Sequence, residues 1–381
     1  MTAYFADNVE LDGREAARMP PMPREVVATH EEAGAEELPP LIIREPLEAF
    51  LEREGLGDGR VKPERIGEGH SNVTFLLRRE GDARLVLRRP PRPPLPPSAH
   101  DVLREARLLA AVRGTSLRVP PVLAVCDDES VLGVPFYVME RIDGEVITNE
   151  VPATLDSPPQ RRRIAEELVD ALVEMHAVDW RACGLEGFGK PTGYLERQLR
   201  RFGGLWEHNK TRDLAVVQEV SDWLAQNMPQ SPEATIVHGD YRLGNTMFAR
   251  EAPARLVAVF DWEMATIGDP LADVGYMTAT WARPDEMHET MFDRMSVTHA
   301  EGFLSRDELV ARYEERTGRS MSDLRWYQAL ALWKAAVFME GNYKRSLAGT
   351  TDDPWLRMFD EGVPQLAEAA REITRMPAPS A

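Results

Sequence analysis

Cysteine is scarce in this chain of 381 residues, which has Cys126 and Cys183 far apart in the sequence. So sparse a pattern excludes a disulfide-stapled scaffold and a cysteine-based metal cluster, and it is typical of the reducing cytoplasm, where we expect the protein. No run of 18 or more apolar residues occurs, so no membrane span is expected. The first ten residues have no basic segment followed by an apolar one, so we expect no secretory signal.

Basic residues are outnumbered by acidic ones, and lysine is rare. The chain has five lysines against 40 arginines, and its net charge is −18. An acidic chain is a poor nonspecific partner for nucleic acid or an anionic membrane, and we expect it to bind neither. The preference for arginine bears on any site that ordinarily uses lysine.

The composition is that of a large folded protein whose first residues are strongly acidic. A hydrophobic content of 43% is enough for a substantial core, and the length allows two domains. Residues 1–55 hold 13 acids and five arginines, which gives −8 of the total charge. We therefore predict a flexible acidic arm at 1–40, a small β-rich lobe at 41–143 and a larger, mainly helical lobe at 144–381.

Local patterns place strands in the first lobe and helices in the second. Six prolines between Pro90 and Pro97 predict an extended connection, and apolar residues at helical spacing predict a helix from Val102 to Val112. Beyond Pro158 the pattern is mostly helical. Strands are predicted at the β-branched and aromatic runs V-T-F-L-L, L-V-L, V-L-A-V-C and V-P-F-Y-V-M-E.

The stretch from His238 to Asp261 carries the clearest chemistry. It reads H-G-D-Y-R-L-G-N, then the apolar run L-V-A-V-F, then D-W-E. Kinases use an acid, an amide five residues later and a second acid after a short strand to hold a hydroxyl nucleophile and magnesium ions. Asp240 would accept the proton of the hydroxyl, and Asn245 and Asp261 would give magnesium hard oxygen ligands. Arg242 would steady the transferring phosphoryl group or pair with Asp240.

Together these segments resemble the aminoglycoside phosphotransferase-like family of small-molecule kinases. The chain is most similar to the branch with phosphotransferase domains fused to some acyl-CoA dehydrogenases. This resemblance implies an α+β, protein-kinase-like fold of two lobes, with ATP and Mg²⁺ as cofactors. It covers about 60–280 and is carried by I-G-E-G-H-S-N-V-T-F-L-L, L-V-L-R-R-P-P, R-E-A-R-L-L, Y-V-M-E-R-I-D-G, V-H-G-D-Y-R-L-G-N and F-D-W-E-M-A-T-I-G-D-P-L-A-D-V-G.

The resemblance also marks a turn for the nucleotide phosphates. Gly67, Gly69 and Ser71 lie in a loop whose backbone amides would approach the phosphates, because glycine permits unusual dihedral angles and close contact. Asn72 stands where the kinase pattern has its third glycine. Because of this departure, the loop is a weaker sign of a kinase than the catalytic segment is.

Further nucleotide contacts follow from the same resemblance. Arg88 aligns with the strand cation that contacts the α- and β-phosphates, ordinarily a lysine, and Glu105 aligns with the acid that orients it. Arg89 is the rival, although strand alternation would send it to the opposite face. The adenine would contact the Glu140 carbonyl and the Ile142 amide in the segment that joins the lobes.

Four more residues of the larger lobe have expected structural roles. His238 is expected to brace the loop, and Asp273 resembles a family residue that anchors it through backbone hydrogen bonds. Asp269 is predicted to cap a helix or turn. His176 is predicted to be a core or capping histidine.

The sequence predicts phosphoryl transfer from ATP to a hydroxyl of a small molecule, and it leaves the acceptor open. An aminoglycoside-like compound and a hydroxylated metabolite such as a hydroxyacyl-CoA both remain candidates. A catalytically weak nucleotide-binding scaffold is the alternative. The strand arginine and the missing third glycine favour the scaffold, whereas the intact Asp240, Asn245 and Asp261 argue against it.

Overall fold

The chain folds into two compact units, which we call the N-lobe and the C-lobe. The N-lobe comprises Met1–Arg113 and Pro120–Ile142, and the C-lobe comprises Gly114–Val119 and Asp143–Ala381. The short Gly114–Val119 segment thus belongs to the C-lobe, although the sequence placed it within the N-lobe. The computed structural model describes residues 24–67, 72–79, 82–93, 100–282, 290–294, 296–349 and 354–376.

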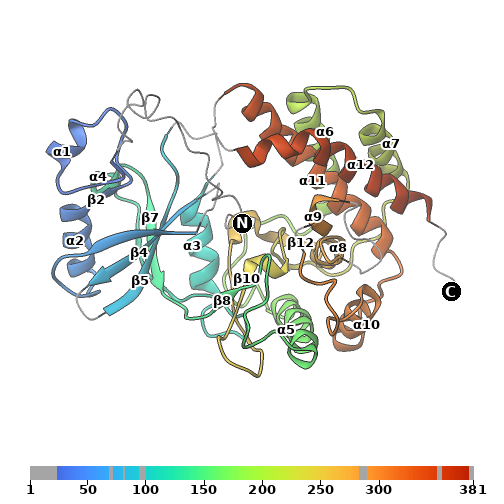
Figure 1. Cartoon of the computed structure of the whole chain (residues 1–381), viewed down its shortest axis with the longest axis horizontal. Coiled ribbons are helices and arrows are strands. Elements are labelled where there is room, and N and C mark those ends of the chain that lie inside the picture. The colour runs from blue at the N-terminus through green and yellow to red at the C-terminus, as the bar shows by residue number, and fades with distance from the viewer. Residues whose placement is uncertain are drawn as a thin grey trace. The chain divides into compact units, whose positions relative to one another are not determined.

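The N-lobe is built on an antiparallel five-stranded sheet with the strand order β3-β4-β5-β7-β6 (Figure 1). Helix α3 packs on β6 and β7. The elements of the lobe are β1 (Val26–Val27), α1 (His30–Gly34), β2 (Ile42–Ile43), α2 (Arg44–Arg53), β3 (Lys62–Ile66), β4 (Val73–Arg79), β5 (Asp82–Arg89), α3 (Val102–Ala111), β6 (Val122–Cys126), α4 (Glu129–Leu132) and β7 (Phe136–Glu140).

The core of the N-lobe forms where α2 meets one face of the sheet. Phe75 on β4 and Phe136 on β7 are almost fully buried, as is Phe50 on α2. The rings of Phe50 and Phe136 meet edge to face with centroids 5.1 Å apart. Such a pair adds to the burial of apolar area, so α2 is held firmly against the strands.

Residues 24–40 are not the flexible arm that their composition predicted. Val26 and Val27 pair in parallel with Ile42 and Ile43, and Val27 is buried. The Thr29 side chain caps α1 by accepting a hydrogen bond from the Glu32 amide. The acidic composition of this segment concealed a short apolar anchor, while residues 1–23 lie outside the described residues.

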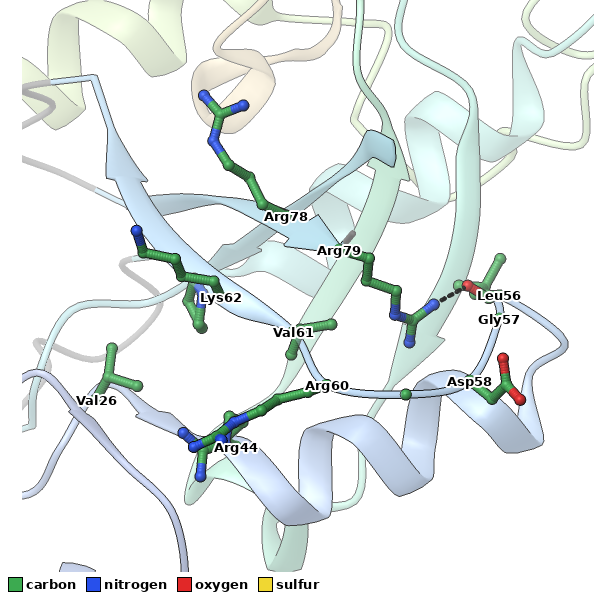
Figure 2. Close-up of a pocket in the computed structure, with 12 residues that line it drawn as sticks. Val26, Arg44, Leu56, Gly57, Asp58, Arg60, Val61, Lys62, Arg78 and Arg79 are labelled. Carbon is green, nitrogen blue, oxygen red and sulfur yellow. Dashed lines mark hydrogen bonds between the residues drawn. The ribbon is translucent and has the colours of Figure 1, made fainter. Parts of the chain in front are cut away.

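A basic pocket of about 1110 Å³ lies at one end of the β3–β4 hairpin (Figure 2). The antiparallel register pairs Lys62 with Arg78 and Ile66 with Thr74, so the pocket is at the end opposite the glycine turn. Arg79 donates to the Leu56 carbonyl at 2.6 Å and fixes the loop before β3. The pocket is lined by Val26, Arg44, Leu56, Gly57, Asp58, Gly59, Arg60, Val61, Lys62, Pro63, Arg78 and Arg79.

The C-lobe is mainly helical, with short strands that carry loops between the helices (Figure 1). Strand β10 pairs with β8 and β11, and β9 pairs with β12. The elements of the lobe are β8 (Glu145–Val146), α5 (Pro158–His176), α6 (Tyr194–Asn209), α7 (Ala215–Gln226), β9 (Thr235–Val237), η2 (Leu243–Asn245), β10 (Thr246–Phe248), β11 (Leu256–Val259), η3 (Trp262–Met264), β12 (Thr266–Gly268), α8 (Leu271–Ala279), α9 (Met291–Arg294), α10 (Arg306–Thr317), α11 (Leu324–Leu347), η4 (Pro354–Met358) and α12 (Phe359–Arg375).

Helix α11 is the central helix of the C-lobe. It packs against α6, α7, α8 and α12, and many of its side chains are apolar. Trp333, Ala336 and Val337 are buried there. Despite this apolar content, none of the helices in the described part of the chain is long and apolar enough to cross a membrane.

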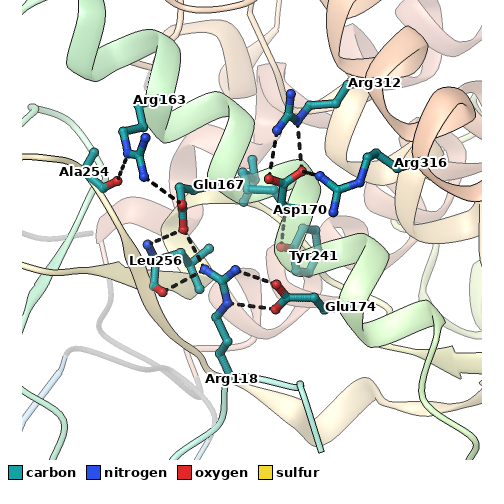
Figure 3. Close-up of polar contacts among 11 residues, drawn as sticks. Arg118, Arg163, Glu167, Asp170, Glu174, Tyr241, Ala254, Leu256, Arg312 and Arg316 are labelled. Carbon is teal, nitrogen blue, oxygen red and sulfur yellow. Dashed lines mark hydrogen bonds and ion pairs between the residues drawn. The ribbon is translucent and has the colours of Figure 1, made fainter.

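Arg118, in the Gly114–Val119 segment, connects α5 to β11 (Figure 3). Arg118 binds both oxygens of Glu174 at 2.7 and 2.8 Å, and it donates to Glu167 at 2.6 Å and to the Leu256 carbonyl at 2.9 Å. Burial opposes the charge of Arg118, but the carboxylates of Glu174 and Glu167 outweigh it and raise its pKa. The backbone amide of Val259 also donates to the Arg118 carbonyl at 2.8 Å. Arg118 therefore holds the backbone of β11 through both its own side chain and its own carbonyl.

Replacing Arg118 with methionine tests this network. The change leaves Glu167 and Glu174 without their cation, and these carboxylates are only partly exposed. We expect Arg118→Met to lower the free energy of unfolding by about 2 kcal/mol, between the values typical of exposed and buried pairs. Urea denaturation provides the measurement, with the exposed Arg113→Met as the control. An equal effect of the two substitutions would contradict the proposed role of Arg118.

Candidate active site

The loop that follows β9 is held by one buried carboxylate. Asp273, near the start of α8, accepts the backbone N–H of His238 at 2.7 Å and that of Gly239 at 2.8 Å. Gly239 has φ +86°, a conformation that glycine adopts without strain. Asp273 is fully buried, so its two oxygens set the path of the backbone immediately before Asp240.

Two histidines support this anchor, in agreement with the roles expected for them. His176 at the end of α5 contacts Asp273 through Nε2 at 3.3 Å and the Tyr313 hydroxyl through Nδ1 at 2.7 Å. Burial lowers the pKa of His176, more than the adjacent Asp273 raises it. His238 bonds the Phe260 carbonyl at 2.8 Å, and its ring packs on Trp262 with centroids 4.7 Å apart.

Asp240 and Asn245 are joined directly. The Asn245 amide nitrogen donates to the Asp240 carboxylate at 2.7 Å and to its backbone carbonyl at 2.8 Å. This contact orients the Asn245 carbonyl oxygen, the atom that a metal ion would use. Arg242 lies 3.6 Å from the Asp240 carboxylate. Burial lowers the pKa of Arg242, but Asp240 and Asp261 outweigh burial and raise it.

Asp261 follows the β10–β11 hairpin in a constrained position. Thr246 pairs with Val259, and the Phe260 amide donates to the Asn245 carbonyl at 2.9 Å. These bonds join the chain just before β10 to the chain just after β11, so Asn245 and Asp261 lie at the same, open end of the hairpin. Asp261 has φ +66° and ψ +60°, a left-handed conformation that aspartate tolerates better than most residues. Backbone strain of this kind gathers at functional sites.

The donors at this end of the hairpin fit a magnesium ion. Asn245 and Asp261 offer oxygen ligands, and magnesium binds through one or two carboxylates together with phosphate oxygens and water. Within the described ranges there is no group of three or more His, Cys, Asp or Glu side chains that could hold a metal on its own. Such a sparse set is poor for zinc and suited to an ion that arrives with a phosphate ligand.

The ion pair expected on the N-lobe sheet is formed. Arg88 on β5 donates to Glu105 on α3 at 2.9 Å, and Glu105 is buried. Arg89 points to the other face of the strand, where it is buried and donates to the carbonyls of Leu41 and Pro90. Burial lowers the pKa of Arg89 to about 10. Arg89 is thus a structural arginine, and Arg88 stays the candidate for the phosphates.

The remaining predicted nucleotide residues are placed only in part. Gly67 has φ +71° and Asn72 is buried, while Gly69 and Ser71 lie outside the described residues. Glu140 ends β7 and its amide donates to the Pro121 carbonyl at 2.9 Å. Ile142 is half-buried at the end of the N-lobe.

Two residues beside the catalytic loop were not predicted from the sequence. Tyr276 on α8 lies near Asp240, and burial, together with the negative charge of Asp240, raises its pKa well above the ordinary value. Lys334 on α11 lines a small cavity with Tyr276 and Gly239. Tyr276 follows Asp273 by three residues on the same helix, a spacing that could have signalled it. Lys334 is far away in the sequence and carried no signal except the rarity of lysine.

The sheet-containing N-lobe, the helical C-lobe and the loop at Asp240 define a protein-kinase-like fold. The sequence pattern of the phosphotransferase enzyme family matches residues 62–330, and the chain belongs to this family. Acyl-CoA dehydrogenase family member 11 of Gallus gallus is 33% identical over 324 residues, which are 83% of this chain and 41% of that protein. Family member 10 of Mus musculus is 32% identical over 80% of this chain and 28% of that protein. The chain therefore spans less than half the length of these curated relatives.

Solved structures agree on the fold. A crystal structure of a candidate aminoglycoside phosphotransferase from Ralstonia eutropha has a TM-score of 0.75 and 32% identity, over 87% of this chain and 98% of that chain. A thermostable aminoglycoside phosphotransferase mutant in ternary complex with AMP-PNP and hygromycin B has a TM-score of 0.55 and 18% identity, over 88% and 100%. The second likeness concerns the fold alone.

The anchoring role of Asp273 can be measured by substitution with asparagine. The amide of Asp273→Asn keeps one acceptor oxygen and turns an NH₂ group toward the other donors, so one buried amide loses its partner. We expect the free energy of unfolding to fall by about 2–4 kcal/mol. Urea denaturation gives the value, and Asp213→Asn is the control because Asp213 is exposed and loses the same charge. Stability equal to that of the control would be incompatible with the anchor.

Proposed function

We propose that this protein transfers the γ-phosphoryl group of ATP to a hydroxyl group of a small molecule. The single observation that carries the proposal is the contact of Asp240 with Asn245 at the end of the hairpin that leads to Asp261. A general base and two oxygen ligands close to one another are what phosphoryl transfer requires of a protein. Family membership supports the same reaction class.

In the proposed reaction Asp240 accepts the proton of the acceptor hydroxyl. The hydroxyl oxygen forms a bond to the γ-phosphorus, the bond from that phosphorus to the β–γ bridging oxygen breaks, and ADP leaves. The hydrogen bond from the Asn245 amide holds the Asp240 carboxylate in position for this step. Most of the rate enhancement would come from such positioning and from charge neutralisation.

Magnesium and ATP are the proposed cofactors. Magnesium would be held by the carbonyl oxygen of Asn245 and the carboxylate of Asp261, and it supplies neutralisation of the phosphate charge when bound. On the N-lobe we propose Arg88 as the phosphate-binding cation, oriented by Glu105. Gly67, Gly69, Ser71 and Asn72 remain the proposed phosphate loop.

The acceptor is proposed to be a hydroxylated metabolite such as a hydroxyacyl-CoA, with an aminoglycoside-like compound as the second candidate. The relatives named as acyl-CoA dehydrogenases favour the hydroxylated metabolite. The structural neighbour named as an aminoglycoside phosphotransferase favours the aminoglycoside-like compound. The intact contact between Asp240 and Asn245 argues against an inactive scaffold. We place the reaction in the cytoplasm, because Cys126 and Cys183 are both free thiols.

The catalytic assignment predicts the effect of replacing Asp240 with asparagine. The variant keeps the size of the side chain but cannot accept a proton, so we expect kcat to fall by about 10²–10⁴-fold. Turnover is measured with an acceptor found by mass spectrometry among aminoglycosides, hydroxyacyl-CoAs and cell extract. Exposed Asp222→Asn serves as the control for the loss of one charge. Unchanged turnover in Asp240→Asn would remove Asp240 from the mechanism.

A further inference from the structure

Lys334 occupies an unusual position for one of only five lysines in the chain. It lies on α11, the central helix of the C-lobe, and its side chain is partly buried. It lines a cavity of about 10 Å³ beside the catalytic loop, room for about one water molecule. The other lining residues are Tyr194, Gly239, Ala272, Tyr276, Tyr327, Leu330 and Ala331.

The cavity is next to the proposed base. Gly239 immediately precedes Asp240 in the loop, and Tyr276 lies near enough to Asp240 for that carboxylate to help raise its pKa. Lys334 thus shares one small space with the residue that precedes Asp240 and with a second residue that lies near Asp240. A group held at Lys334 would therefore lie close to whatever Asp240 acts on.

The ammonium group of Lys334 has no carboxylate counter-ion among the described residues. Its Nζ lies over the ring of Phe202, 4.8 Å from the ring centroid. Burial lowers the pKa of Lys334 to about 8, and Arg201 acts in the same direction, while Asp273 and Asp240 oppose them. At neutral pH the amine is still mostly protonated, so the site keeps a desolvated positive charge.

The carboxylates around Lys334 are already engaged elsewhere. Asp273 accepts two backbone amides and contacts His176, and Asp240 is bonded to Asn245. A partly buried cation without a carboxylate counter-ion is unfavourable, and an anion that enters the cavity would relieve this cost. One oxygen of a carboxylate or phosphate has about the size of the water that the cavity accommodates.

We propose that Lys334 binds an anionic oxygen group of the acceptor, so that the acceptor is a hydroxylated carboxylate or phosphate compound. This inference rests on the proposed phosphotransferase function and narrows its substrate class. The ammonium would bind the anionic group while the hydroxyl meets Asp240. A polycationic acceptor such as an aminoglycoside would instead bring like charge against Lys334 and be rejected.

The charge of the acceptor is tested on the full chain with a metabolite extract. Ion exchange separates the extract into anionic, neutral and cationic fractions, and each is incubated with the protein, ATP and Mg²⁺. Mass spectrometry then seeks compounds that gain one phosphate. We expect the acceptor with the highest kcat/KM in the anionic fraction, and phosphatase treatment of that fraction beforehand distinguishes carboxylates from phosphates.

Each other outcome of the screen has a definite meaning. A best acceptor in the neutral or cationic fraction would overturn the assignment of Lys334 and leave phosphoryl transfer standing. No acceptor in any fraction would contradict the proposed function, and the assignment would fall with it.

Substitutions then locate the effect at Lys334. With an anionic acceptor, Lys334→Met should raise the acceptor KM by about 10–100-fold, the scale of a lost charged hydrogen bond, and leave the KM for ATP unchanged. Lys334→Arg keeps the charge and should restore part of the affinity. The matched control is Lys344→Met, since Lys344 is exposed on the same helix and donates to the His208 carbonyl at 2.6 Å.

A purely structural role for Lys334 predicts a different pattern. If Lys334 served only the ring of Phe202, Lys334→Met would change the melting temperature or kcat and leave the acceptor KM equal to that of Lys344→Met. That pattern would overturn the proposal.

Discussion

The buried carboxylate of Asp273 is the constraint on which the active-site loop depends. One side chain accepts the amides of His238 and Gly239, and the same carboxylate is backed by His176. A charge this deeply buried is tolerated because its oxygens are hydrogen-bonded. The backbone just before Asp240 is consequently fixed by long-range contacts between α5, α8 and the loop. Such a rigid support is needed where catalysis depends on the positions of the reacting groups.

A second constraint fixes the metal-binding end of the site. The β10–β11 hairpin and the bond from Phe260 to Asn245 bring the two proposed ligand positions together. Arg118 ties β11 to α5 from the other side (Figure 3). Both constraints meet on α5, since His176 ends this helix and Glu167 and Glu174 lie along it. Helix α5 is therefore the common support of the base and of the metal ligands.

Much of this arrangement could be predicted from the sequence, because the residues concerned are close together along the chain. The spacing from Asp240 to Asn245 and the apolar strand before Asp261 fix local geometry, and the pair of Arg88 with Glu105 followed from the family pattern. Lys334 could not be found this way, because only the packing of α11 on α8 brings it to the loop. The arm was predicted too long, because four apolar residues in β1 and β2 outweigh the acidic composition around them.

The most direct test of the account follows one oxygen atom through the reaction. The acceptor is prepared with ¹⁸O in its hydroxyl group and incubated with the protein, ATP and Mg²⁺, and the products are analysed by mass spectrometry. The account predicts ADP and a phosphate ester in equal amounts, with the ¹⁸O retained as the bridging oxygen of the ester. Release of inorganic phosphate with the acceptor unchanged, or formation of AMP, would contradict it.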